Sequence, residues 1–587
     1  MKKIIPALLL ALSVAACNRS GKAPAANSTV SADSTFQACA KEYIAGYLAW
    51  RPLTATGLGL HEYDGRFTDY SRSSIDSELA RLKGFRAKLA GLDTTRLGRK
   101  MFYDYRILRS AVESEIFSFD DMGSYTSNPM TYAGAIDVNI YIKRDFAPLE
   151  DRIRSIIAIE RHAPALFAAA RSNLADTLPR PFVETAIEVA SGNADFLKKD
   201  LVTALANVTN DSLMKTFRRV NDSAISELNN YVEYLKKEKL PRSNNRYALG
   251  REKFSRMLAL EELINLPPEK ILEIGMAELK KEQEAFAAAA HIIDSSKKPV
   301  DVYREIQRDH PTAESLIPDT RRDLEMIVKF IGDHNIISIP SSVPARVEET
   351  PQYERATSFA SMDTPGPFEK KATEAYYYVT PVEPGWSPKQ KEEWLTAFNY
   401  YTTDVVSIHE SYPGHYVQFL HLNASPATDI EKIFGSYAYT EGWAHYTEKM
   451  MLDEGFGADS GVVRGAKYRL AQAGESLLRL CRLCVSIRTH CQGMLLDEAT
   501  KFFQDNCYYE EKPSHQEALR GTYDPGYLYY TLGKLEILKL REDYKRQEGA
   551  GYSLKKFNES MVDNGMPPVR LLREVLLRDS TKYGEIL

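Results

Sequence analysis

Two histidines and a glutamate lie close together in the segment Ile408-His409-Glu410-Ser411-Tyr412-Pro413-Gly414-His415. Imidazoles and carboxylates are the usual ligands of a catalytic zinc ion, and a glutamate beside a ligand can take the proton from water. The residue types therefore predict hydrolysis by a zinc-activated water. In this interpretation His409 and His415 are metal ligands, and Glu410 is the general base.

The spacing of the two histidines requires a break in the helix. In the pattern H-E-x-x-H the histidines are four residues apart and share one helix face. Here they are six apart, which on an unbroken helix is ~240° of rotation. Pro413 lacks a backbone donor and Gly414 tolerates unusual dihedral angles, so we expect a kink that returns His415 to the face of His409. The alternative is a helix end with two unrelated histidines.

A second segment offers a third ligand. Glu441 and His445 are four residues apart and Glu448 is seven from Glu441, so the three lie along one stripe of a predicted helix. Glu441 follows His415 by 26 residues, which leaves room for a loop and a returning antiparallel helix. We predict that Glu441 is the third ligand. The main alternative is His445 in its place.

These two segments, H-E-S-Y-P-G-H at 409–415 and E-G-W-A-H-Y at 441–446, resemble the bacterial family called domain of unknown function 885. The resemblance continues through 520–534 and extends to 47–52 and 564–568, so it covers nearly all of the mature chain. Members of that family look like distant gluzincin metallopeptidases. The resemblance implies a large helical, zincin-like body around a deep cleft, one Zn²⁺ per chain, and cleavage of short peptide substrates.

The same resemblance suggests residues that stabilise an oxyanion and bind substrate. Gluzincins of the thimet oligopeptidase type supply a tyrosine hydroxyl from a Gly/Tyr-rich loop late in the chain, and residues 526–530 look like that loop. Tyr530 is the first choice for this catalytic role, and Tyr527 is the second, as a substrate contact. In gluzincins a strand bordering the cleft pairs with extended substrate, and the aromatic segment 373–380 is proposed for that role, with an ordinary core strand as the alternative.

Three further side chains have predicted supporting roles. Arg520 is expected to hold a substrate carboxylate or carbonyl, because its planar fork suits bidentate contacts; an ion pair with Glu517 is the alternative. His445 is expected to bind substrate or to orient Glu441. His490 follows no complete family pattern, and a buried structural histidine is the favoured interpretation.

The elements that must position these residues are mostly helices. Apolar residues recur at helical intervals from residue 36 to about 335, and again after Pro388. The segment 373–380 is the strongest strand candidate, and 351–371 is rich in turn residues and predicts a loop over the site. The predicted fold is mainly α with a small β-sheet near the active site. An N-terminal helical part, 36–345, would form one cleft wall, and a catalytic part, 346–587, would contain the edge strand and the zinc-site helices.

The N-terminus has the pattern of an exported protein. Lys2 and Lys3 precede an apolar run, 4–14, and Ala15-Ala16-Cys17 completes a lipobox, which predicts a signal peptide, 1–17, and lipid attachment at Cys17. The apolar run is shorter than the ~20 residues that span a membrane. Residues 18–35 predict a flexible tether. We therefore expect a bacterial lipoprotein held at a membrane, on the periplasmic or cell-surface side, by its N-terminal lipid anchor.

Composition limits the remaining possibilities. The net charge of −5 over 587 residues gives no reason to expect nucleic-acid binding. Five cysteines remain after Cys17, and Cys481 and Cys484 lie in an apolar helical run that predicts buried thiols. Two rival hypotheses stay open. One is a catalytically silent lipoprotein that captures peptides or cell-wall fragments, and the other is a zinc hydrolase acting on another substrate.

Overall fold

The computed structural model describes residues 31–351, 355, 358–459 and 461–587. The predicted signal peptide, Cys17 and most of the predicted tether lie outside the described residues. The first helix, α1 (Ala32–Trp50), begins inside the predicted tether, because the Ser31 side chain accepts a hydrogen bond from the Ser34 backbone N–H at 3.1 Å and caps the helix. Among the described helices, none has both the length and the apolar character needed to cross a membrane.

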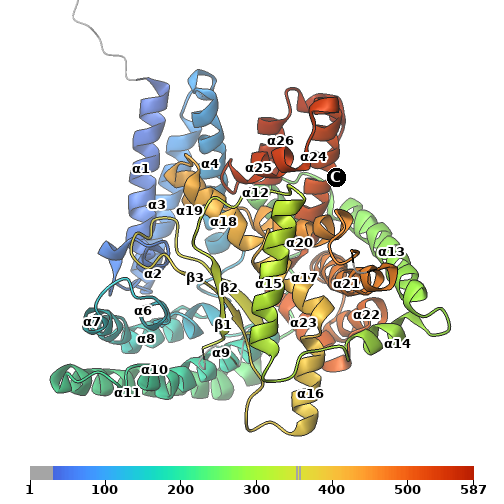
Figure 1. The fold of residues 1–587 in the computed structure, drawn as a ribbon. Helices are drawn as coiled ribbons and strands as arrows, with labels where there is room; N and C mark the ends of the chain where they lie inside the picture. The colour runs from blue at the N-terminus through green and yellow to red at the C-terminus, as the bar shows by residue number, and fades with distance from the viewer. Residues whose placement is uncertain (1–30, 352–354, 356–357, 460) are drawn as a thin grey trace, which may run out of the picture.

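The fold is mainly α, as predicted (Figure 1). The helices before the sheet are α1, α2 (Pro52–Gly57), α3 (Arg72–Ala90), α4 (Arg99–Asp120), α5 (Met130–Ala133), α6 (Ile140–Lys143), α7 (Leu149–Glu160), α8 (Ala163–Asn173), α9 (Arg180–Lys198), α10 (Asp200–Ala204), α11 (Asp211–Tyr234), α12 (Arg251–Glu261), α13 (Pro268–Ile293), α14 (Pro299–Ile306) and α15 (Leu316–Asp333).

The helices after the sheet include those with the candidate ligands. They are α16 (Pro388–Ala397), α17 (Tyr400–Glu410), α18 (His415–Ala424), α19 (Asp429–Ile433), α20 (Tyr437–Asp453), α21 (Val462–Gln492), α22 (Leu496–Cys507), α23 (Glu511–Tyr523), α24 (Tyr529–Glu548), α25 (Leu554–Val562) and α26 (Val569–Leu576). The short 3₁₀ helix η5 (Pro525–Leu528) leads directly into α24.

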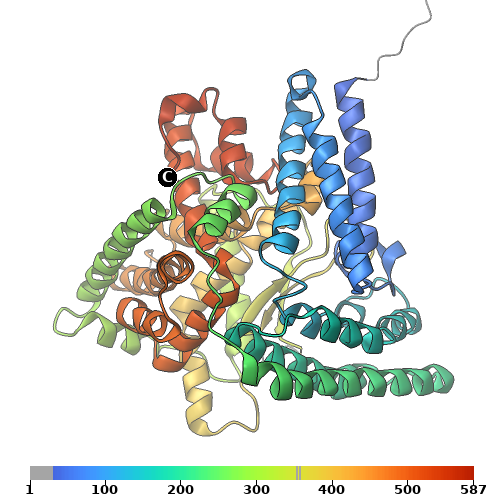
Figure 2. The same cartoon turned by 180° about the vertical axis from the view of Figure 1, so that it is seen from behind.

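The helices form groups around the small sheet. Helices α1, α3 and α4 stand side by side, and α7 to α11 form a layer across one end of them (Figures 1 and 2). One hydrophobic core, here called the α7–α11 core, includes buried side chains of that layer such as Ile156 and Leu228. The largest core, here called the central core, joins side chains from both sides of residue 345, among them Leu279 of α13 and Leu483 of α21.

The sheet has the strand order β1–β3–β2, from β1 (Ala345–Glu349), β2 (Ala360–Asp363) and β3 (Ala375–Val379). The predicted strand 373–380 is confirmed as β3. Its predicted position at the edge is wrong, because β3 pairs with β1 in parallel and with β2 in antiparallel fashion, so both of its edges are occupied. The strand at the edge near the site is β2, inside the segment that the sequence predicts as a loop.

Helices α20 and α24 cross at two glycines. A Cβ atom on Gly442 would lie 2.5 Å from the backbone of Gly533, and one on Gly533 would lie 1.7 Å from the Ala438 carbonyl oxygen. Only glycine permits so close an approach of two helix backbones. The crossing fixes α20, which carries Glu441, against the start of α24, which carries Tyr530.

Candidate metal centre

The segment between α17 and α18 contains the predicted break. Helix α17 ends at Glu410 and α18 begins at His415. The Gly414 backbone N–H donates to the Ile408 carbonyl at 3.0 Å, and the Tyr412–Pro413 peptide is cis. A Cβ atom on Gly414 would lie 1.8 Å from the His409 carbonyl oxygen, so glycine is required by a close approach.

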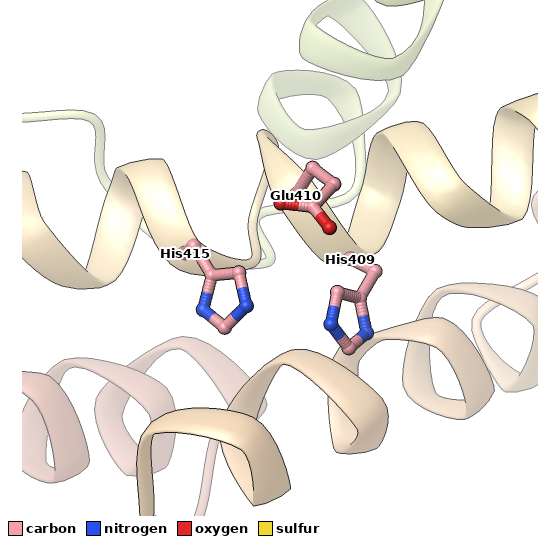
Figure 3. Close-up of side chains that lie close together, drawn as sticks. All are labelled: His409, Glu410 and His415. Carbon is pink, nitrogen blue, oxygen red and sulfur yellow. The ribbon is translucent and has the colours of Figure 1, made fainter. Parts of the chain in front are cut away.

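The break brings the two histidines to the same side of the chain. Figure 3 shows both imidazoles pointing to one side of the α17–α18 segment, with ring centroids 4.9 Å apart. Across from them, Glu441 Oε2 lies 3.4 Å from His409 Nε2 and 3.5 Å from His415 Nε2. The three predicted ligands therefore converge from α17, α18 and α20.

Two of the donor-atom separations match those of a tetrahedral zinc site. Zinc–nitrogen and zinc–oxygen bonds of ~2.0–2.1 Å in a tetrahedron place neighbouring donors ~3.3–3.4 Å apart, close to the distances from Glu441 to the two imidazoles. Donor atoms of His409, Glu410 and His415 also lie within 4.8 Å of one another. Glu410 is half-buried and accepts a hydrogen bond from the Met362 backbone N–H of β2 at 3.3 Å, so it lies beside the ligands.

Glu448 fixes the orientation of His409. Its Oε1 lies 2.7 Å from His409 Nδ1, and its side chain is fully buried. This contact leaves Nε2 as the ring nitrogen that faces Glu441. A carboxylate behind a metal-binding imidazole is a common arrangement, because it fixes the tautomer and makes the ring a better ligand.

The charges around His409 favour a bound cation. Burial alone would lower the pKa of His409, but hydrogen bonds to Glu441 and Glu448 raise it to about 9. Burial opposes ionisation of Glu441, yet the charge of His415 and hydrogen bonds from both imidazoles hold the pKa of this carboxyl well below its usual range. Two ionised glutamates therefore surround His409 and attract positive charge to its position.

The hydrogen-bond partners of His445 are Glu448 and Lys534, and not Glu441 as the sequence suggested. It is 1% exposed, its Nδ1 lies 3.0 Å from Glu448 Oε2, and its Nε2 lies 3.2 Å from Lys534 Nζ. Burial, reinforced by the charge of Lys534, lowers the pKa of His445 to about 3, so the ring is neutral. Its predicted roles as a substrate contact and as the partner of Glu441 are corrected to that of a partner of Glu448.

The two candidate tyrosines have different surroundings. Tyr530 is half-buried, and the guanidinium carbons of Arg479 and Arg482 lie over its ring, 5.8 Å and 5.3 Å from the centroid. Burial raises the pKa of Tyr530 and the charge of Glu441 adds to this, so the phenol keeps its proton. Tyr527 is fully buried in the central core, so its predicted substrate contact does not fit this arrangement.

Arg520 pairs with Asp524, which follows it by four residues. Its side chain is 31% exposed and bonds to Asp524 at 2.9 Å and to the Tyr437 hydroxyl at 3.2 Å. The alternative ion pair with Glu517 is not found, because Glu517 forms a bidentate pair with Arg482 at 2.7 and 2.8 Å. Arg520 thus keeps partial exposure on the side of Tyr437.

Two structural predictions are confirmed outside the centre. His490 is buried, with Nε2 2.8 Å from the Gly521 carbonyl and Nδ1 accepting from the Leu249 N–H, as expected for a structural histidine. Cys481 and Cys484 are fully buried.

Sequence reasoning missed three contributors to the centre. Lys534 contacts His445, Arg479 Nη2 lies 3.5 Å from Glu448 Oε1, and Met362 donates to Glu410. Glu448 was visible on the ligand stripe, and Lys534 ends the conspicuous segment 520–534. No signal marks Met362, because its contribution is a backbone N–H.

Comparison with known proteins places the chain in a family. The profile described as "Bacterial protein of unknown function (DUF885)" matches residues 52–576. The chain belongs to DUF885. A solved structure titled a "putative lipoprotein of unknown function" from Shewanella oneidensis is similar to this DUF885 chain, with 25% identity and a TM-score of 0.76, over 93% of this chain and 100% of that one.

A second structure, titled a "putative lipoprotein" from Colwellia psychrerythraea, shares the fold with a TM-score of 0.75 and 16% identity, over 93% of this chain and 99% of that one. No curated protein is significantly similar in sequence to the chain.

Proposed function

We propose that this DUF885 protein is a zinc-dependent hydrolase, and that its substrates are short peptides. The observation that carries the proposal is the placement of Glu441 Oε2 at 3.4 and 3.5 Å from two imidazole nitrogens, with Glu410 beside them. His409, His415 and Glu441 would hold one ion per chain. Three protein ligands leave a fourth position open, which is typical of catalytic rather than structural zinc sites.

Glu410 is the residue that moves the proton. Bound zinc supplies Lewis acidity and a water molecule acidic enough to lose its proton near neutral pH. The Glu410 carboxylate accepts that proton and passes it to the leaving amine. The Met362 N–H holds Oε2 of Glu410 at 3.3 Å, which restricts the carboxylate to one side of the ligands.

Two further side chains suit a peptide substrate. Attack on an amide carbonyl produces an oxyanion, and the protonated Tyr530 hydroxyl is proposed to donate a hydrogen bond to it. Arg520, which is partly exposed beside Tyr437, is proposed to hold a carboxylate or carbonyl group of the substrate.

Strand β2 takes over the binding role that the sequence assigned to β3. Among the described strands it lies at the edge of the sheet, and the Met362 N–H donates to Glu410 beside the proposed ligands. An extended peptide lying along this edge would pair with β2 and present its carbonyl to the centre. We propose that substrates bind in a cleft bordered by this strand.

The cellular location is also part of the proposal. The lipobox at Cys17 and the titles of the two similar structures support a lipid-anchored protein on the periplasmic or cell-surface side of a membrane. The proposed substrates are therefore peptides outside the cytoplasm.

The decisive experiment is Glu410→Gln. We expect the purified parent to contain about one zinc per chain and to cleave members of a peptide library analysed by mass spectrometry. Because the amide cannot accept the proton, Glu410→Gln should keep its zinc and lose ~10²–10⁴-fold in hydrolysis rate.

The matched control is Glu393→Gln on α16, whose side chain is 63% exposed, and it should behave as the parent. Full activity in Glu410→Gln would reject the proposed base. A parent that binds zinc but cleaves no peptide would reject peptide substrates, and a parent without zinc would reject the metal centre.

A further inference from the structure

We propose that Lys534 is a positioning residue for the metal centre: through His445 it holds in place the Glu448 carboxylate that orients His409. This inference rests on the zinc site proposed above. The Lys534 side chain is buried, and two residues, His445 and Glu448, link it to the proposed ligand His409.

The starting point is the position of the lysine. Lys534 lies in α24 and its side chain is almost completely buried. Its Nζ lies 2.9 Å from Ser476 Oγ and 3.2 Å from His445 Nε2. Burial lowers the pKa of Lys534, and the negative charges of Glu282 and Glu448 oppose this effect only in part.

The Glu448 carboxylate offers only acceptors. His445 Nδ1, 3.0 Å from Glu448 Oε2, must therefore carry the proton of the neutral imidazole. Its Nε2 is then the acceptor, and Lys534 Nζ donates to it at 3.2 Å. The opposite tautomer would turn a lone pair towards the carboxylate and lose both hydrogen bonds.

Glu448 carries the effect to the ligand. With Oε2 occupied by His445, its other oxygen, Oε1, accepts the Nδ1–H of His409 at 2.7 Å. His409 Nε2 is then the ring nitrogen that faces Glu441. Lys534 and His445 together restrain the Oε2 side of Glu448, so that Oε1 stays turned towards His409.

The chain of contacts connects four helices. Lys534 comes from α24, Ser476 from α21, His445 and Glu448 from α20, and His409 from α17. Arg479 of α21 adds a weaker contact to Glu448 Oε1 at 3.5 Å. A shift of any of these helices therefore changes the orientation of His409.

The test measures zinc affinity by competition with a chelator, with zinc as the only ligand. Lys534→Met keeps an unbranched side chain one atom shorter and removes the donor. We expect its zinc affinity to fall about tenfold, the lower end of the effects seen when outer partners of metal ligands are removed. Lys545→Met, an exposed position on the same helix, is the matched control and should bind zinc as the parent does.

A double-mutant cycle separates positioning from general loss of packing. If Lys534 acts through Glu448, then Lys534→Met should have no further effect on zinc affinity in a Glu448→Gln background. Equal losses in both backgrounds, or parental affinity in Lys534→Met, would overturn the inference. If Lys534→Met does not fold, the same cycle with His445→Phe decides the question by the same criterion. A parent that binds no zinc would instead reject the proposed function.

Discussion

Glu448 of α20 and Glu160 of α7 are both buried glutamates, at 0% and 1% exposure, but they lie in the central core and the α7–α11 layer respectively. Glu448 contacts two imidazoles and a guanidinium, and these partners hold its pKa well below the usual range against the opposing effect of burial. Among the described residues Glu160 finds no hydrogen-bond donor for either oxygen, and burial raises its pKa to about 8.

The two glutamates differ in how their buried charge is compensated. Burial alone makes a carboxyl group keep its proton, whereas burial with opposite charges keeps it ionised and fixed in direction. The second arrangement is costly to assemble and is found where a charge must be placed at one point. The region around α20 has this arrangement, and the surroundings of Glu160 in the α7–α11 layer do not.

The largest difference between the α20 region and the α7–α11 layer should appear in how closely the helix backbones pack. Gly533→Ala places a methyl group 1.7 Å from the Ala438 carbonyl oxygen and forces α20 away from α24. We expect the free energy of unfolding to fall by about 3 kcal/mol or more, measured by denaturant unfolding. Gly192→Ala in α9, where a Cβ atom meets nothing within 4 Å, should instead stabilise by about 0.5–1 kcal/mol. Equal effects would mean that the helix crossing is not tightly packed.

The next contrast concerns the two glutamates themselves. Glu448→Gln should lower zinc affinity by about 10–100-fold, because an amide has only one oxygen to accept from His409 and His445. Glu160→Gln should leave zinc affinity unchanged. Chelator competition measures both. If Glu448→Gln bound zinc as tightly as the parent, the two buried glutamates would not differ in their effect on the metal centre.

A third contrast is in the pH dependence of stability. Glu160 has a pKa of about 8 in the folded protein and ~4.3 when exposed, so between these values only the folded state binds the proton. Its contribution to stability is complete below the lower value and decreases as pH rises, by up to about 1.4 kcal/mol per pH unit.

Glu160→Gln lacks this titration, so its melting temperature should fall less than that of the parent between pH 5 and pH 8. Glu284→Gln, a position with 69% side-chain exposure, should follow the parent. If the melting temperatures of Glu160→Gln and the parent fell equally between pH 5 and pH 8, Glu160 would not be an unpaired buried carboxyl group.

Much of the helical framework follows from local sequence. The apolar periodicity predicts α13 and the long α21, and aromatic composition predicts β3. The position of β2 does not follow, because Ala360–Asp363 has no strand composition and becomes a strand by pairing with β3. The same limit explains why the sequence assigned the edge to the wrong strand.

The candidate site divides in a similar way. Residue types and spacing were sufficient to select His409, Glu410, His415 and Glu441, because a proline–glycine break and an i,i+4 stripe are local features. They could not separate Tyr530 from Tyr527, since both occur in one short loop and only packing decides which is buried.

The sequence by itself determined the family, the candidate ligand types and the chain break that lets them meet. Only the tertiary structure decided that His445 supports Glu448 rather than Glu441, and that Lys534 supports His445. The physical reason is that hydrogen-bond partners on different helices are selected by how closely those helices approach. That approach depends on side chains along the whole length of α20 and α24, beginning with the two glycines where they cross.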